Sequence, residues 1–438
     1  MKKIPFWIAL IVLLLSVLCG YSYLVALAAK GKHMRGLGAP LRSFAMFPKT
    51  VSSVLSSQEI RGAGPSMIST DDGYDPATQD VNLLKQDLFG LMPFFDGKTK
   101  QWEVVLENFR TGERLRIWEL PPSLFEQNTD RVYAASRPKH SLVMPDGGLI
   151  VNFTRTRNLL RIDAESRPVW ANREMFYHHG MNVGPDGHIW VCATPYAEGR
   201  KNPLMNYSYR NPSGDTYAFR DDHATKIDRE TGEILETHSI AELLRAHDQF
   251  GRLIGQRGHA DPIHLNDIEP VLEDGPHWLA GDLFLSCRNL SAVIHFRPAT
   301  NEIVKIIEGP LIRQHDAVIL SDHEVSFFNN YNTWAGTSAP GTEPELVFPS
   351  SELTVYDYAT DSLRVQFKEV MNQNRLHTPT AGLHYPLTGG RMLLDLDDFG
   401  RIVVVDSTDI LFSRTYPAPV EGYKHLTSWP RIYQTSPL

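Results

Sequence analysis

Four histidines stand directly before short apolar segments, and they are the first candidates for chemistry in this chain. The clearest copy of the pattern runs from Arg313 to Asn330 (RQHDAVILSDHEVSFFNN), where His315 precedes a strand-like segment, a polar turn and a second strand. Similar segments begin at His140, His179 and His264, and a weaker copy begins near residue 380. Because a polar residue takes the same place in several copies, we expect these side chains to converge on one point.

The spacing of these copies predicts an all-β fold. Each copy contains four strand-like segments joined by polar turns, and successive copies lie 39 residues (His140 to His179) or 51 residues (His264 to His315) apart. A β-propeller blade has four strands in about 40–50 residues. Six units are expected, starting near residues 100, 140, 179, 264, 315 and 380. A two-sheet sandwich explains the repetition less well.

The first strand of each propeller blade lines the central channel, so residues that open these strands face one another. The carboxylates Asp267 and Asp316 come one residue later and, by strand alternation, are expected to point away from the channel. Arg288 belongs to the second strand of its blade and is expected to reach inward. The predicted channel residues are His140, His178 or His179, His264, Asn266, Arg288 and His315.

An arginine among imidazoles favours an anion over a cation. The planar guanidinium group binds tetrahedral oxyanions through two parallel hydrogen bonds, and an imidazole can act as a nucleophile. Three histidines would also satisfy a catalytic zinc ion, so a metal site is an alternative. The residues favour a site for sulfate, phosphate or carboxylate.

The run HLNDIEPV, followed by GDLFLSCRNLSAVIHFRPATNEIV and RQHDAVIL, resembles the bacterial aryl-sulfate sulfotransferase family of six-bladed β-propellers. That family has a histidine and an asparagine opening one blade, matched here by His264 and Asn266. An S-x-R-x-x-x-x-V strand follows, matched by Arg288 and its neighbours, and then a Gln-His pair, matched by Gln314 and His315. The resemblance covers roughly residues 138–415.

The resemblance implies transfer of a sulfuryl group from a phenolic sulfate ester to a phenolic acceptor, with no cofactor and no nucleotide donor. His315 would be the nucleophile that becomes transiently sulfated. The other catalytic residues would be His264, Arg288 and His178 or His179, and the substrate-binding candidates are Asn266, Gln314 and His140. Donors fixed around a sulfuryl group in transfer would stabilise its negative charge, and one further imidazole would exchange the phenolic proton.

Two other functions fit the same pattern. A metal-dependent propeller hydrolase or lactonase would use the histidines as ligands and would lose activity with a chelator. A non-catalytic binding propeller would tolerate loss of the histidines. This alternative gains from three long insertions, at about residues 195–222, 240–262 and 332–350, of which the second is expected to be partly helical.

The N-terminal region predicts a membrane anchor. Residues 5–29 carry no charged side chain, and about 20 apolar residues suffice to span a bilayer. We expect a single-pass anchor within residues 1–33, a linker over residues 34–85 and the propeller over residues 86–438, on the outer side of the membrane. The net charge of -8 argues against a nucleic-acid partner, which usually requires a basic face.

Overall fold

The computed structural model describes residues 66–70, 80–125, 135–154, 156–256, 259–331, 333–335 and 345–438, together with six isolated positions between residues 13 and 20. The chain divides into two compact units, Met1–Ala63 and Gly64–Leu438. The predicted anchor over residues 5–29 lies almost entirely outside the described residues. Within the part of the chain that the structure describes, no helix is long and apolar enough to cross a membrane. Membrane attachment therefore stays a prediction from the sequence.

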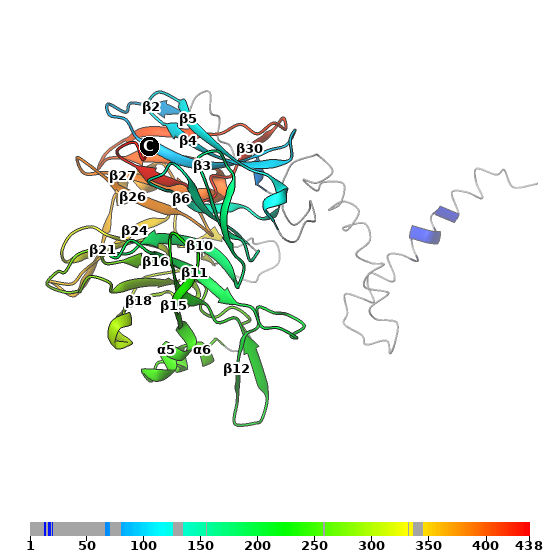
Figure 1. Cartoon of the computed structure of the whole chain (residues 1–438), viewed down its shortest axis with the longest axis vertical. Helices are drawn as coiled ribbons and strands as arrows, with labels where there is room; N and C mark the ends of the chain where they lie inside the picture. The colour runs from blue at the N-terminus through cyan, green and yellow to red at the C-terminus, as the bar shows by residue number, and fades with distance from the viewer. Residues whose placement is uncertain are drawn as a thin grey trace, which may run out of the picture. The chain divides into compact units, whose positions relative to one another are not determined.

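Six antiparallel sheets, five with four strands and one with five, build the second unit and confirm the predicted six-bladed propeller (Figure 1). We number the blades 1 to 6. From the innermost strand outward, blade 1 consists of β31 (Arg431–Tyr433), β3 (Phe89–Asp96), β4 (Gln101–Asn108) and β5 (Glu113–Leu120). Blade 2 consists of β6 (Pro138–Val143), β7 (Leu149–Phe153), β8 (Leu159–Ile162) and β9 (Pro168–Asn172). Blade 3 consists of β10 (Met175–Val183), β11 (Ile189–Pro195), β14 (His223–Ile227) and β15 (Ile234–Ser239).

The second half of the ring repeats the same arrangement. Blade 4 consists of β16 (Leu265–Pro270), β17 (Leu283–Cys287), β18 (Ala292–Arg297) and β19 (Glu302–Ile307). Blade 5 consists of β20 (His315–Ile319), β21 (Glu324–Asn329), β24 (Glu352–Asp357) and β25 (Ser362–Gln366). Blade 6 consists of β26 (Leu383–Leu387), β27 (Arg391–Leu396), β28 (Arg401–Val405) and β29 (Ile410–Thr415). Innermost strands of consecutive blades contact one another from β6 through β26, and β31 contacts β6.

Blade 1 closes the ring with strands from two distant parts of the chain. The innermost strand, β31, pairs with β3, so that Phe89 lies opposite Tyr433. Blades 1 and 6 then share one apolar core, in which Met92 and Val105 pack with Phe412. The sequence pattern had placed the first unit near residue 100, which is only β4 and β5. The three-residue strand β31 carried no recognisable pattern of its own.

The insertions carry secondary structure of their own. The first contains the hairpin of β12 (Tyr207–Arg210) and β13 (Thr216–Phe219), and the second contains α5 (Ile240–Ala246) and α6 (Gly251–Ile254), as predicted. The hairpin and both helices lie beside blades 3 and 4 (Figure 1), and their side chains pack into one core with those blades. The remaining small elements are β22 (Trp334–Ala335) with β23 (Glu345–Leu346), and α7 (Lys368–Gln373).

Part of the predicted linker belongs to the propeller unit. β1 (Met67–Ser69) pairs with β30 (Tyr423–His425), and β2 (Val81–Asn82) extends blade 6 by pairing with β29. Both strands lie before residue 86, where the propeller had been expected to begin. Main-chain hydrogen bonds therefore attach these two strands of the predicted linker to β29 of blade 6 and to β30, which follows it.

Candidate functional site

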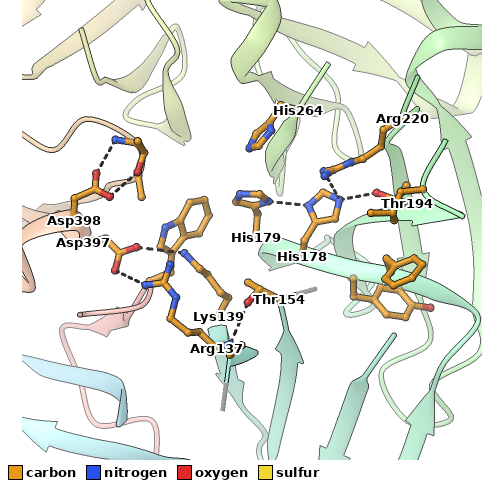
Figure 2. Close-up of a pocket in the computed structure, with 17 residues that line it drawn as sticks. Arg137, Lys139, Thr154, His178, His179, Thr194, Arg220, His264, Asp397 and Asp398 are labelled. Atoms are coloured by element: carbon orange, nitrogen blue, oxygen red, sulfur yellow. Dashed lines mark hydrogen bonds and ion pairs between the residues drawn. The ribbon is translucent and has the colours of Figure 1, made fainter. Parts of the chain in front are cut away.

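A cavity of about 510 Å³ opens at the centre of the propeller, and most of its polar lining comes from the inner ends of blades 2, 3 and 6 (Figure 2). Such a volume is typical of small-molecule sites. Its polar and aromatic lining consists of Arg137, Lys139, Thr154, Phe176, Tyr177, His178, His179, Thr194, Arg220, His264, Thr380, Asp397, Asp398 and Trp429.

Hydrogen bonds between neighbouring blades determine which residues face this cavity. In blade 2, Nδ1 of His140 accepts from the Met181 backbone N–H of blade 3 (3.2 Å). In blade 4, Asp267 accepts from the Ala317 N–H of blade 5 (3.0 Å), and in blade 5, Asp316 accepts from the His384 N–H of blade 6 (2.7 Å). These three side chains hold adjacent blades together and, as expected for the two carboxylates, point away from the cavity.

The residue before each of these interblade acceptors occupies the equivalent channel position of its blade. These residues are Lys139 in blade 2, Asn266 in blade 4 and His315 in blade 5. In blade 3 the same register places His179 in the channel, followed by Gly180, whose missing Cβ leaves room for Asp267 (Oδ1 2.3 Å from an ideal Cβ). Lys139, and not His140, is thus the counterpart of His315.

The histidines predicted from sequence meet around one tryptophan. The ring of His179 lies 5.1 Å from the ring of His264, 6.5 Å from that of His315 and 5.2 Å from that of Trp429. His315 and Trp429 are 5.8 Å apart. Burial holds the pKa values of His179 and His315 well below the usual range, with further contributions from His178 and from Arg288 respectively. Both imidazoles are therefore neutral near pH 7.

His178 and His179 both line the cavity, but they have different partners. Their Nδ1 atoms are 2.8 Å apart, so one ring donates to the other. His178 also lies beside Thr194, Asp222 and Arg220 (Figure 2). Among the described residues, His179 has no such anchors and instead contacts the other histidine rings. Its backbone is left-handed (φ 55°), as are those of His140 (45°) and His264 (53°), and such strain in non-glycine residues concentrates at functional sites.

Arg220 joins blades 3 and 4 through a buried ionic network. Its guanidinium group donates to the fully buried Asp222 (2.7 Å) and lies 3.8 Å from Asp261. Asp261 in turn contacts Nδ1 of His264 at 2.6 Å. Burial alone would raise the pKa of Asp222, but the charge of Arg220 and a hydrogen bond from His178 hold it well below its usual value. The network therefore keeps a cation at one edge of the cavity.

Asn330 fixes the orientation and tautomer of His315. The amide group of Asn330 donates to the carbonyl oxygens of Thr378 (2.7 Å) and Ala381 (2.9 Å), so its Oδ1 must face the imidazole. Oδ1 lies 2.6 Å from Nδ1 of His315 and can only accept. Nδ1 therefore carries the proton, and Nε2 keeps its lone pair.

Lys139 is the cation of blade 2 at the cavity wall. It is only 4% exposed, and its Nζ lies 3.4 Å from Asp397 and 4.6 Å from the centre of the Trp429 ring. Burial lowers the pKa of Lys139 to about 8, although Asp397 opposes the shift. Arg137, on the same side, lies 3.6 Å from Asp397.

His315 and the remaining predicted residues lie around the cavity rather than on its wall. Arg288 is half-buried, and its Nε has no hydrogen-bond partner among the described residues. Asn266 and Gln314 are fully buried. Asn266 donates to the Gln314 carbonyl, and Gln314 donates to the Ala292 carbonyl, each at 2.9 Å. His140 is enclosed between Met181, Arg431 and the Tyr385 hydroxyl, so the structure does not bring it to the cavity.

Sequence reasoning missed most of the cavity lining, including Lys139, Arg220 and Trp429, and it missed Asn330 beside His315. A signal for Lys139 was present. The pairs Lys139-His140, Asn266-Asp267 and His315-Asp316 share one order, with a channel residue followed by an interblade acceptor. Arg220 lies at the end of an insertion, and Trp429 precedes β31, so neither falls within a recognisable repeat.

A six-bladed propeller whose central cavity gathers neutral imidazoles and buried cations is suited to a small anionic ligand. The family model for arylsulfotransferase (ASST) matches residues 140–414 of this chain. The chain therefore belongs to the arylsulfotransferase family, whose membership indicates a transferase. No curated protein matches this chain.

Several solved structures are similar to this chain at low sequence identity. A protein of unknown function from Bacteroides caccae is 11% identical over 75% of this chain and 93% of its own, with a TM-score of 0.45. Kuenenia stuttgartiensis hydrazine synthase is 13% identical over 76% and 80%, with a TM-score of 0.41. Virginiamycin B lyase from Staphylococcus aureus is 10% identical over 67% and 93%, with a TM-score of 0.35. Likenesses this distant carry no argument about the function of this chain.

Proposed function

We propose that this protein transfers a sulfuryl group from an aryl sulfate ester to a phenolic acceptor, through a sulfated histidine at position 315. The observation that carries the proposal is the hydrogen bond between Asn330 and His315. It leaves the Nε2 lone pair available for attack. The low pKa of His315 keeps that atom unprotonated at neutral pH. A neutral, oriented imidazole is the state that a nucleophile needs.

The transfer takes place in two balanced steps. In the first, Nε2 of His315 forms a bond to sulfur while the bond from sulfur to the aryl oxygen breaks, and the phenol departs with a proton supplied by an acid of the site. In the second, the oxygen of the acceptor phenol bonds to sulfur while the bond between nitrogen and sulfur breaks, and the conjugate base of that acid takes the proton of the acceptor. Neither step requires a cofactor, because the ester itself supplies the activated group.

Donors around His315 stabilise the sulfuryl oxygens during both steps. Arg288 lies close enough for its charge to lower the pKa of His315, and its Nε atom is free to donate among the described residues. His264 and His179 contribute ring nitrogens from blades 4 and 3. Fixed donors in a site with little water stabilise developing negative charge more strongly than water does.

Asn266 and Gln314 have an indirect role in this proposal. Their side-chain amides join blade 4 to the main chain of blade 5 immediately before His315. Each has a side-chain oxygen without a partner among the described residues. We propose that they hold the backbone before the nucleophile in place. His140 contributes through its bond to Met181 instead of through contact with substrate.

The test uses the purified full chain with 4-nitrophenyl sulfate, with and without phenol as acceptor. We expect nitrophenolate release that phenol accelerates, and a sulfuryl adduct at His315 in the protein quenched during turnover. His315→Ala should lose both. His323→Ala is the matched control, because His323 lies eight residues later in a turn of the same blade, bonded to Asp322, and should keep both.

Two results would redirect the proposal. A sulfuryl adduct on another histidine would assign the nucleophile to that residue instead of His315. A folded wild-type protein with neither release nor adduct would favour the non-catalytic binding function. The metal-dependent alternative predicts loss of activity with a chelator. Among the described residues, the side chains spaced to hold a metal ion are His323, Glu324 and Asp357, which lie in blade 5 outside the cavity.

A further inference from the structure

We propose that Lys139 is the acid–base residue that gives a proton to the departing phenolate and takes it back from the acceptor phenol. This inference rests on the proposed sulfuryl transfer and assigns a residue that the histidine pattern does not include. It follows from the position of Lys139 in the ring, from its surroundings and from the chemistry of phenols.

Lys139 and His315 face each other across the channel. They occupy the equivalent position of blades 2 and 5, which lie opposite in a closed ring of six. The ring of Trp429 lies near both, with its centre 4.6 Å from the Lys139 ammonium and 5.8 Å from the centre of the His315 ring. In transfer of a phosphoryl group, the attacking and leaving atoms lie roughly in line, and a tetrahedral sulfuryl group obeys the same geometry. Attack from His315 therefore drives the aryl oxygen toward Lys139.

The surroundings of Lys139 keep its amine able to gain and lose a proton. Burial is the main cause that lowers its pKa to about 8, and Arg137 adds to it, while Asp397 and Asp395 from blade 6 oppose it. Figure 2 shows the side chain extending between Asp397 and His179. An acid with a pKa near the working pH and near that of phenols, about 10, is well matched to this exchange.

The neighbouring imidazoles are less suited to the same task. Burial holds the pKa values of His179 and His315 well below the usual range, and it lowers that of His178. These rings are therefore neutral and carry no spare proton at neutral pH. Arg137 and Arg220 stay charged throughout and cannot act as a base. Lys139 is charged when the donor binds and becomes neutral once the phenol has left.

The proton balance closes over one cycle. In the first step, the ammonium of Lys139 donates its proton to the phenolic oxygen as the bond from sulfur to oxygen breaks. In the second step, the neutral amine accepts the proton of the acceptor phenol as its oxygen attacks the sulfated His315. No proton is consumed, and Lys139 returns to its starting state.

The test compares two donors whose leaving groups differ in basicity. Phenolate is strongly basic and needs a proton to leave, whereas 4-nitrophenolate is much less basic and leaves without one. With the full chain, we expect Lys139→Met to lower kcat/KM for phenyl sulfate about 10²–10⁴-fold, the usual contribution of general acid catalysis. The fall in kcat/KM of the same variant with 4-nitrophenyl sulfate should stay within about tenfold. In the wild type, kcat/KM for phenyl sulfate should fall as pH rises through about 8, and Lys139→Met should lack this dependence.

Controls separate this role from others. Lys139→Met leaves Asp397 without its nearest cation, so folding is checked by thermal unfolding, and Lys139→Met/Asp397→Asn removes the unpaired charge. Lys139→Arg keeps the charge but releases no proton, so it should fail with phenyl sulfate as Lys139→Met does. Equal losses with both donors, or recovery of both by Lys139→Arg, would overturn the inference while the transferase stands. A wild-type protein inactive with both donors, with no adduct at His315, would overturn the transferase as well.

Discussion

The Oδ1 atom of Asn330 lies 2.6 Å from Nδ1 of His315, while the Asn330 amide group is held by two backbone carbonyls. We expect Asn330→Leu to lower kcat about 10–100-fold, the usual effect of losing a residue that orients a reactive imidazole. KM should change little, because Asn330 is fully buried and does not line the cavity. Steady-state kinetics with 4-nitrophenyl sulfate measures kcat and KM separately.

Asn329→Leu is the matched control for Asn330→Leu. Asn329 is equally buried and also has its side chain fully hydrogen-bonded, but to Pro310, Ile312 and Thr354. Both variants should lose stability. If both lose kcat equally, the effect is one of folding and Asn330 does not orient the nucleophile.

Breaking the buried network around Arg220 should cost stability. Arg220→Met leaves the fully buried Asp222 without its main cation, and removing one partner of a buried pair typically costs about 3–5 kcal/mol. We expect a loss of that size in the free energy of unfolding in urea. Arg167→Met provides the comparison, because Arg167 pairs with Asp163 at the surface, where such pairs contribute about 0–1 kcal/mol. Similar losses in the two variants would contradict the network.

The propeller should lose stability in mild acid. Burial holds the pKa values of His140, His179 and His315 well below the usual value. Below about pH 6.5, the unfolded chain binds protons that the folded chain excludes, so the free energy of unfolding falls as pH falls. We expect a lower Tm at pH 5.5 than at pH 7.5, and a smaller difference in His140→Gln.

His323, near the surface, provides a control whose protonation affects stability in the opposite direction. Its hydrogen bond to Asp322 raises its pKa, so the folded chain gains protons there more readily than the unfolded chain. Removing it by His323→Gln should not reduce the loss of stability in acid. A Tm that is the same at both pH values would contradict the assignment of neutral buried histidines.

Gly180 is the position at which blade 3 makes room for blade 4. In Gly180→Ala the new Cβ would lie 2.3 Å from Oδ1 of Asp267, which holds Ala317 of blade 5. We expect a loss of about 1–3 kcal/mol, as for other overpacked cores, measured by thermal unfolding. Gly97→Ala has no atom within 4 Å of the new methyl group and should be neutral. An unchanged Tm for Gly180→Ala would show that Asp267 moves freely.

The sequence predicted the blades because each repeats its apolar strands and polar turns in a similar order. It did not predict the closure of blade 1, since three residues of β31 are too few to show a period. The partner strand β3 lies more than 300 positions away in the chain. Chain order alone places these two strands in different units.

The sequence predicted that several histidines would meet, as they do, but not the register of their strands. Aligning the copies by their histidines placed His140 with His315, whereas the interblade hydrogen bonds align Lys139 with His315. The physical reason is a β-bulge at the start of these strands, where the pairing register shifts after Lys139 and after His315. A bulge interrupts the alternation of side chains, so the pattern cannot tell which residue of the pair faces the channel.

The pairing of β31 with β3 also makes catalysis a probe of refolding. Such a contact between distant segments is slow to form, because a long loop must close first. Until it forms, Trp429 has no fixed place, and the cavity lacks the indole ring that lies near Lys139 and His315. After dilution from denaturant, most of the β-sheet signal in circular dichroism should therefore return before activity does. The delay between the two signals measures how long the propeller remains unclosed.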